Sequence, residues 1–516
     1  MNLFAVSDPK PLAPGLYTTD AFHRKILIAI KERTGHESNN RQLVVRSWEE
    51  AYSLHGRPSI DDVNLAWIAR FITGDCSASV SPYKRIKRLP RASNILIETD
   101  GTVHAKAFDP FASGFSRIDS SALHKYIRGI LLNNLDQALS SGHHLVGCEH
   151  SSGIDSNALV GALLRGLKIR PERLHTISWE PGTEGQLLNK FRSLHGLVPD
   201  NCHKALPLES CEWADIRKKT IRMLGSPPQL GGNLVAARSL KEQGCSIMFS
   251  GFGGDQAISH NGMNALTDLV EQWRFLDLFN WAGNSHNAFK IFIDRRLALS
   301  SPKWKSFRLQ AKARSWISFD VLKRALTSQG RLSFGEIIEA DASAECDYYC
   351  RIHDSIRRRT MADWIAVRVE EEIRISKYYE IEKHFPYLDE FLIGSLLAQD
   401  PSHFTSGPQG GRLVARQAFA DFLPPLLVDN PSKNRNIEEY ASSNRVIQKE
   451  VLEQLMRDWP ELHEYLATWL DLEMVRTFCE NVLTANSPSF EVLVQATKAL
   501  NILLQLSDWF SLLEKT

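Results

Sequence analysis

The sequence contains no long apolar run, no excess of either charge and no paired cysteines. No stretch approaches the roughly 20 apolar residues that a membrane-spanning helix requires. Lys and Arg number 61 and Asp and Glu 60, so no overall field attracts nucleic acid or an anionic membrane. The eight cysteines form no CxxC pair, and no cleavable signal segment opens the chain. We therefore expect a soluble, cytoplasmic protein with reduced thiols, whose partners include neither nucleic acid nor membrane.

Three familiar active-site motifs are also missing. No GK[ST] follows a glycine-rich turn, which excludes a Walker A phosphate loop, and the absence of GxGxxG excludes the usual dinucleotide fingerprint. The GxSxG turn of serine hydrolases is absent as well. A nucleotide site in this chain must therefore be of another type.

The first 115 residues predict a small β-containing domain. The run RQLVVRSW is typical of a strand, and an amphipathic helix is expected over 59–73 with Ser59 as its N-cap. Residues 94–108 alternate apolar and polar side chains around an Asp-Gly pair, which is a strong hairpin signal. This segment has the size of a fragment of a domain.

Residues 116–440 alternate helix and strand patterns, which is typical of a doubly wound parallel sheet. The expected elements are helices over 119–140, 155–166, 183–195, 211–223 and 233–243 and strands over 143–148, 174–179, 202–208 and 245–250. After about residue 265 the pattern is mostly helical, with amphipathic stretches at 361–379 and 443–516. We predict an α/β fold with domains at 1–115, 116–440 and 441–516.

Two of these strands run into turns that carry small residues and an aspartate. The first turn is Ser151-Ser152-Gly153-Ile154-Asp155-Ser156, and the second is Gly251-Phe252-Gly253-Gly254-Asp255. Parallel strands place such turns at one edge of the sheet, where the free N–H groups at a helix start favour an anion. Two carboxylates beside phosphates suit Mg²⁺. The pair predicts a Mg-nucleotide site, although either turn alone is also typical of an ordinary helix cap.

These motifs resemble those of the asparagine synthetase family. HSSGIDS is similar to the SGGxDS pyrophosphate loop, and FSGFGGDQ is similar to the SGxGxDE motif, at a similar separation. The family includes β-lactam synthetase, carbapenam synthetase and the lasso-peptide cyclases. KHFPYLD and DNPSKNRNIEEY extend the resemblance, which covers roughly residues 60–440. The closest character is that of the β-lactam synthetase and lasso-cyclase members that lack a working glutaminase.

The resemblance implies a pyrophosphate-loop ATPase fold and an AMP-forming amide ligase that uses ATP and Mg²⁺. It assigns Asp155 and Asp255 to the metal, Lys433 to the transition state of amide formation and Glu370 to catalysis. The residues that it assigns to ATP and pyrophosphate are Ser151, Ser152, Gly153, Asp155, Ser156, Ser250, Gly251 and Gly253.

The chain also departs from the family pattern. Ser152 stands where the family has glycine, Phe252 replaces the tyrosine or carboxylate of β-lactam-forming relatives, and Gln256 replaces glutamate. Glu370 is the first of three consecutive glutamates, a pattern that is more typical of a solvated helix face.

The largest departure concerns the nitrogen donor. The sequence starts Met1-Asn2-Leu3 and its first cysteine is Cys76, whereas a glutaminase needs an N-terminal cysteine. We therefore expect 1–115 to be a truncated remnant and the amine to come from a substrate or from free ammonia. The expected function is a peptide macrolactam cyclase of the lasso type or another natural-product ligase. A precursor peptide is then the candidate carboxylate substrate, and a protease is a candidate partner. The alternatives are an ammonia-dependent asparagine synthase and a non-catalytic relative that binds nucleotide or peptide.

Overall fold

The computed structural model describes most of the chain. The described residues are 10–22, 24, 26–31, 42–56, 58–74, 76–111, 117–179, 182–204, 210–229, 234–313, 320–341, 349–405, 411–429, 437–459, 462–486 and 488–515. Within these ranges no helix has the length and apolar character needed to cross a membrane.

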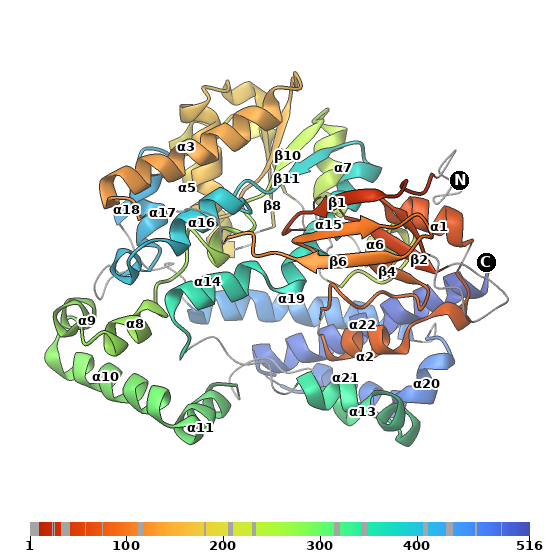
Figure 1. Cartoon of the computed structure of the whole chain (residues 1–516). Coiled ribbons are helices and arrows are strands. Elements are labelled where there is room, and N and C mark those ends of the chain that lie inside the picture. The colour runs from red at the N-terminus through yellow and green to blue at the C-terminus, as the bar shows by residue number, and fades with distance from the viewer. Residues whose placement is uncertain are drawn as a thin grey trace.

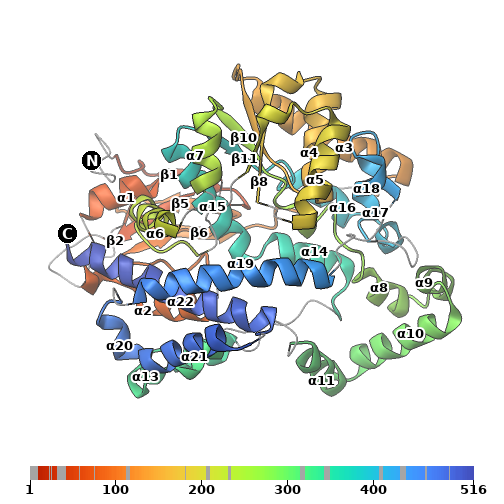
Figure 2. The same ribbon diagram turned by 180° about the vertical axis from the view of Figure 1, so that it is seen from behind.

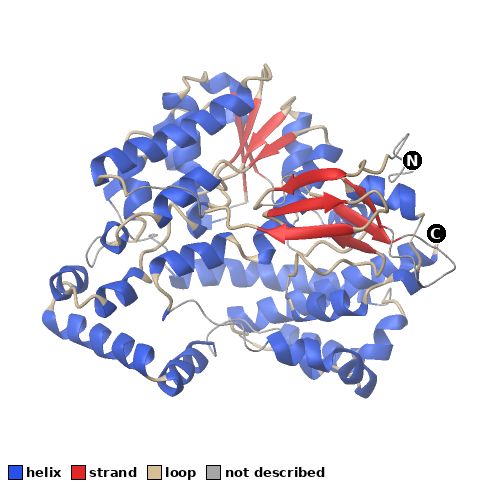
Figure 3. Ribbon diagram, viewed as in Figure 1, coloured by secondary structure: helices blue, strands red, loops and turns tan. Residues whose placement is uncertain are grey.

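The N-terminal part contains two three-stranded antiparallel sheets (Figure 3). The first has the order β1 (Gly15–Thr19), β5 (Ser93–Ile97), β6 (Val103–Ala107), and the second has the order β3 (Gln42–Val45), β2 (Ile28–Lys31), β4 (Ile86–Arg88). Strands β5 and β6 confirm the predicted hairpin. Leu27 and Ile95 belong to one apolar layer that joins the two sheets. The expected β character of this part is therefore confirmed.

The helix that we expected to begin at Ser59 begins later. Ser59 caps a single 3₁₀ turn, Ile60–Asp62, through a capping box with Asp62. The chain then extends, and α2 (Leu65–Thr73) starts at a second cap, Asn64, whose side chain accepts from the Ala66 N–H. The prediction of Ser59 as the cap of α2 was wrong because two caps follow each other here. A further helix, α1 (Trp48–His55), was not predicted.

A parallel five-stranded sheet lies in the upper half of the molecule as drawn in Figures 1 and 3. Its order is β9 (Cys202–Lys204), β8 (Leu174–Ser178), β7 (Val146–Glu149), β10 (Ile247–Phe249), β11 (Glu382–His384). The four predicted strands are confirmed. From β7, the chain first adds β8 and β9 on one side of the sheet. It then returns to the other side of β7, where it adds β10 and β11, so the direction of strand addition reverses between β7 and β10. In open α/β sheets, ligands bind at the carboxyl ends of the strands where such a reversal occurs, which here are β7 and β10.

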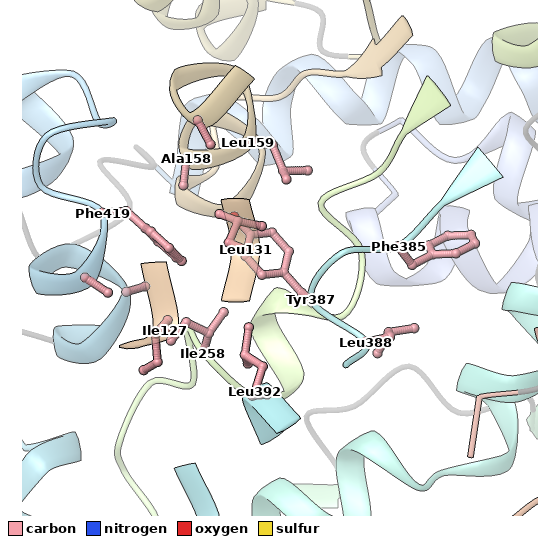
Figure 4. Close-up of a cluster of buried hydrophobic side chains, with 14 of the residues drawn as sticks. Ile127, Leu131, Ala158, Leu159, Ile258, Phe385, Tyr387, Leu388, Leu392 and Phe419 are labelled. Carbon is pink, nitrogen blue, oxygen red and sulfur yellow. The ribbon is translucent and has the colours of Figure 1, made fainter. Parts of the chain in front are cut away.

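Helices surround this sheet. They are α3 (Ser120–Leu139), α4 (Ile154–Gly161, continued by a π-helical turn over Ala162–Gly166), α5 (Gly182–His195), α6 (Ser210–Leu224) and α7 (Leu234–Glu242). All five were predicted. Figure 4 shows part of the hydrophobic core, where Leu131 of α3, Leu159 of α4 and Tyr387 lie together. Burial of these side chains fixes the start of α4 against the sheet.

The rest of the chain is helical. Helices α8 (Ala265–Glu271), α9 (Phe275–Ala282), α10 (Ser285–Ser300) and α11 (Pro302–Ala313) form an arm at one corner of the molecule (Figure 1). The others are α12 (Asp320–Arg324), α13 (Ser328–Asp341), α14 (Ile352–Thr360), α15 (Asp363–Tyr378), α16 (Glu390–Leu397), α17 (Leu413–Ala418), α18 (Pro425–Asp429), α19 (Ile437–Arg457), α20 (Tyr465–Trp469), α21 (Leu472–Thr484) and α22 (Phe490–Glu514).

The C-terminal helices share a core with the N-terminal part. Helices α19 and α22 pack along each other (Figure 2), and Trp509 of α22 stacks edge-on against Trp67 of α2 and Tyr83. The indole of Trp509 also donates to the Gly225 carbonyl at 3.0 Å. The domain boundaries at 115 and 440 stay predictions. The N-terminal part and the C-terminal helices nevertheless pack together in one hydrophobic core.

Candidate active site

The two predicted turns lie against each other at the carboxyl ends of β7 and β10. A Cβ on Gly251 would stand 3.1 Å from the Ser156 nitrogen, and a Cβ on Gly254 would overlap the Asp155 carboxylate. Gly253 adopts φ 97°, and a Cβ there would meet Leu388 at 2.6 Å. Glycine is therefore required for the second turn to pack on the first.

Ser259 connects the two aspartates. Its hydroxyl donates to Asp155 Oδ2 at 2.9 Å and lies 3.4 Å from Asp255 Oδ1. Arg412 donates from Nη2 to the same Asp255 oxygen at 2.7 Å. Both carboxylates thus reach one hydroxyl, which places them close enough to share a ligand. Neither Ser259 nor Arg412 lies in a motif that the sequence analysis used.

The donor set at this point suits Mg²⁺ held together with a phosphate ligand. Mg²⁺ takes oxygen ligands and keeps several waters, so one or two carboxylates suffice. Among the described residues, no cluster of three or more His, Cys, Asp or Glu side chains could hold a metal by itself. Asp155 and Asp255 therefore fit a cation that is bound jointly with its substrate.

The serines of the first turn bond to the turn itself. The Ser156 hydroxyl accepts from the Ser151 N–H at 3.0 Å, and the Ser151 hydroxyl accepts from the Gly153 N–H at 3.1 Å. Ser152, which replaces a family glycine, is half-buried and does not have a positive φ. Its side chain is therefore accommodated without the backbone strain that would demand glycine.

Asn157 supports the turn from below. Its amide nitrogen donates to the carbonyls of Ser151 and Gly153 at 2.9 and 2.8 Å. Its Oδ1 lies 3.1 Å from His150 Nε2 and 3.2 Å from His195 Nε2. Burial lowers the pKa of His150 to about 3 and that of His195 to about 4, so both rings are neutral and donate from Nε2. The network fixes the loop carbonyls inward, beneath the start of α4.

A buried chain of charges runs beside the second turn. Glu149, at the end of β7, accepts from the Ser250 hydroxyl at 2.5 Å and from Lys383 Nζ at 2.7 Å. Lys383 also lies 2.6 Å from Glu372, which accepts from Arg368 Nε at 2.7 Å. The chain therefore alternates in sign from the strand end to helix α15.

The neighbouring opposite charges outweigh the effect of burial on the pKa values of Glu372 and Lys383. Burial opposes ionisation of Glu372, but Lys383 and Arg368 outweigh it and hold the pKa of Glu372 below its usual value. Burial likewise disfavours charged Lys383, but Glu149 and Glu372 raise its pKa above the usual value. All four groups act as one neutral network.

Strand β11 supplies Lys383 and was missed by the sequence analysis. Its three residues, Glu382–His384, are all polar, so they carry no apolar strand signal. The ion pairs of Lys383 replace apolar burial at this edge of the sheet. The motif KHFPYLD, which begins with Lys383, was recognised only through the family resemblance. Its Tyr387 donates to the Asp155 carbonyl at 2.9 Å.

Glu370 does not point toward the two turns. Its carboxylate accepts from the Trp48 indole at 2.5 Å and from Arg88 Nε at 2.9 Å, both in the N-terminal part. The structure therefore does not bring Glu370 to the two turns, and its catalytic role stays a prediction. Glu372, two residues further along α15, is linked to the turns through Lys383 and Glu149. The expectation of a solvated glutamate face was wrong, since all three are buried and Glu371 accepts from the Gln229 N–H.

Two predicted positions have different outcomes. Lys433 lies outside the described residues. Phe252 is half-buried in an aromatic cluster, with its ring 5.8 Å from Trp364 and 6.1 Å from Phe385 between centroids. The Arg368 guanidinium lies 4.1 Å from the centre of the Phe252 ring. The remaining predicted residues lie in the two turns, which contact each other at the carboxyl ends of β7 and β10.

Comparison with known proteins supports this arrangement. The family model described as asparagine synthase matches residues 131–511, which is well over half of the chain and includes the helices after 440. No curated protein is significantly similar to the chain in sequence. The two turns, in contact at the switch point of a doubly wound sheet, lie within the matched range. The chain therefore belongs to the asparagine synthase family, and it is an ATP-dependent ligase that forms C–N bonds.

Proposed function

We propose that the protein adenylates a carboxylate and joins the acyl group to an amine, with release of pyrophosphate and then AMP. The contact that carries this proposal is the approach of Asp155 and Asp255 to the single hydroxyl of Ser259. It brings both family motifs to one place, beside the start of α4. A helix start with free N–H groups favours phosphate.

In this proposal the first turn binds the pyrophosphate part of ATP. The residues that carry it are Ser151, Ser152, Gly153, Asp155 and Ser156, with Ser250, Gly251 and Gly253 of the second turn against them. Asp155 and Asp255 hold Mg²⁺, which when bound neutralises charge on the phosphates. Asn157 keeps the loop carbonyls away from the anion. A carboxylate oxygen of the substrate attacks the α-phosphorus, and the bond to pyrophosphate breaks.

The second step is aminolysis of the acyl-adenylate. The amine nitrogen forms a bond to the acyl carbon, loses a proton, and AMP leaves. Lys433 is proposed to stabilise the negative charge that grows on the acyl oxygen. Phe252 has no titratable group, so the acid–base pair of β-lactam-forming relatives has no counterpart at this position. This proposal gives no catalytic role to Glu370, because its carboxylate accepts from Trp48 and Arg88 in the N-terminal part.

We propose a peptide as the acyl substrate, with the amine supplied by the same peptide, as in a lasso-type macrolactam. A cavity of about 840 Å³ lies beside the sheet edge, but none of the residues of the two turns lines it, so the place of the peptide in the site is itself part of this proposal. The cavity is lined along β11 and reaches Phe385, whose ring lies 6.1 Å from that of Phe252. A short precursor peptide encoded beside the chain's own gene, next to a protease gene, is the candidate.

The test is product analysis with two substrate sets. The enzyme would be incubated with Mg-ATP and the candidate precursor peptide, or with aspartate and ammonium, and nucleotides separated by ion-pair chromatography. We expect AMP and pyrophosphate with the peptide, together with a product lighter by one water. AMP with aspartate and ammonium alone would instead identify an asparagine synthase. ADP and phosphate would contradict adenylation in either case.

A further inference from the structure

Arg368 is a cation held at the second turn. Its side chain is 32% exposed, and its guanidinium lies over the Phe252 ring. Within the described part of the chain, Glu372 is its only hydrogen-bonding partner, through Nε. The Nη donors therefore remain available to a ligand.

The position of this guanidinium is fixed from two sides. The cation–π contact with the Phe252 ring holds one side of the guanidinium, and Glu372, which is 1% exposed and paired with Lys383, holds its Nε edge. An arginine ordered in this way loses less rotamer entropy when it binds a ligand. The aromatic residue at position 252 thus has a physical role that differs from acid–base chemistry.

The neighbourhood of Phe252 indicates the ligand. Gly251, the preceding residue, packs on the backbone of Asp155 and Ser156 in the first turn. A planar guanidinium with two free edge donors matches phosphate oxygens in a bidentate manner. We propose that Arg368 binds the pyrophosphate part of ATP with Phe252 as its platform, an inference that rests on the proposed function.

The experiment measures the affinity of Mg-ATP, inorganic pyrophosphate and AMP by calorimetry. Arg368→Gln should weaken Mg-ATP and pyrophosphate by about 10-fold or more, as expected for a lost hydrogen bond to a charged group, and leave AMP unchanged. Arg368→Lys keeps the positive charge but loses the planar guanidinium, so its affinities for Mg-ATP and pyrophosphate should lie between those of wild type and Arg368→Gln. Phe252→Leu, which keeps Arg368, should also weaken pyrophosphate. Lys377→Gln, an equal charge change on an exposed part of the same helix, is the matched control.

Three outcomes separate this inference from the proposed function. Equal Mg-ATP affinity in Arg368→Gln and wild type would overturn the role of Arg368 and leave adenylation intact. An equal loss for AMP would also overturn it, because the damage would not be specific to the pyrophosphate part of ATP, which AMP lacks. Failure of the wild-type protein to bind Mg-ATP would remove the proposed function, and the inference with it.

Discussion

Lys383→Met should destabilise the protein severely, because it removes one cation from between two carboxylates. Lys383 has no exposed side-chain surface, and it lies 2.7 Å from Glu149 and 2.6 Å from Glu372. Leaving a buried charge without its partner costs about 3–5 kcal/mol. We expect the lower part of that range, about 3 kcal/mol, because Arg368 still pairs with Glu372 and Glu149 is partly exposed.

Urea unfolding measured by fluorescence gives the free energy of unfolding. The matched control is Lys241→Met, which breaks the exposed Lys241–Glu380 pair at 3.0 Å and should cost about 0–1 kcal/mol. The double variant Lys383→Met/Glu372→Gln should recover part of the loss, because fewer charges remain buried. Equal losses for Lys383→Met and Lys241→Met would refute the reasoning.

The directions of the pKa shifts of Glu372 and Lys383 predict how stability depends on pH in the wild type and in Lys383→Met. Glu372 has a lowered pKa, so its contribution is present above the usual 4.5 and is lost as pH falls below it. Lys383 has a raised pKa, so its contribution is present below the usual 10.5 and is lost as pH rises through the folded-state value. The wild-type contribution should therefore be constant between these limits. In Lys383→Met, Glu372 loses one of the cations that lower its pKa and takes up a proton more readily, so the deficit should shrink as pH falls toward 5.

Three further predictions concern the loop and the amide-forming step. Asn157→Leu leaves two histidine Nε2 donors without their shared acceptor and removes one hydrogen bond from each of two loop carbonyls, and calorimetry should show Mg-ATP affinity reduced by about 10-fold or more; unchanged affinity would remove Asn157 from loop positioning. His150 and His195 have pKa values below the usual 6.5, so stability should fall as pH drops below 6.5; His195→Gln should make this slope shallower in urea unfolding, and an equal slope would contradict it. Lys433→Ala should lower the rate of amide formation by about 10²-fold or more while pyrophosphate exchange persists, and near-normal product would exclude this lysine.

Much of the architecture follows from local patterns. The strands before Ser151 and Gly251 are largely apolar and lead into turns of small residues, so the alternation of strands and helices predicts both their parallel sheet and the meeting of the two turns. The Asp-Gly hairpin follows from turn chemistry in the same way. These features depend on near neighbours in the sequence.

The contacts that were missed join distant segments. Ser259 approaches Asp155 across 104 positions, and Arg412 reaches Asp255 across 157. Glu370 and Glu372 are indistinguishable by composition, because only the packing of α15 decides which one faces the N-terminal part. Strand β11 was missed because buried ion pairs, rather than apolar side chains, hold it in the sheet.

The most direct test of the central claim, that the two turns form one Mg-ATP site, is thermal stabilisation by Mg-ATP in wild type, Asp155→Asn and Asp255→Asn. The account predicts that Mg-ATP raises the melting temperature of the wild-type protein, since a ligand that binds only the folded state stabilises it. Each substitution should abolish this shift while leaving the melting temperature without nucleotide within a few degrees. Full stabilisation of both variants by Mg-ATP would contradict the claim.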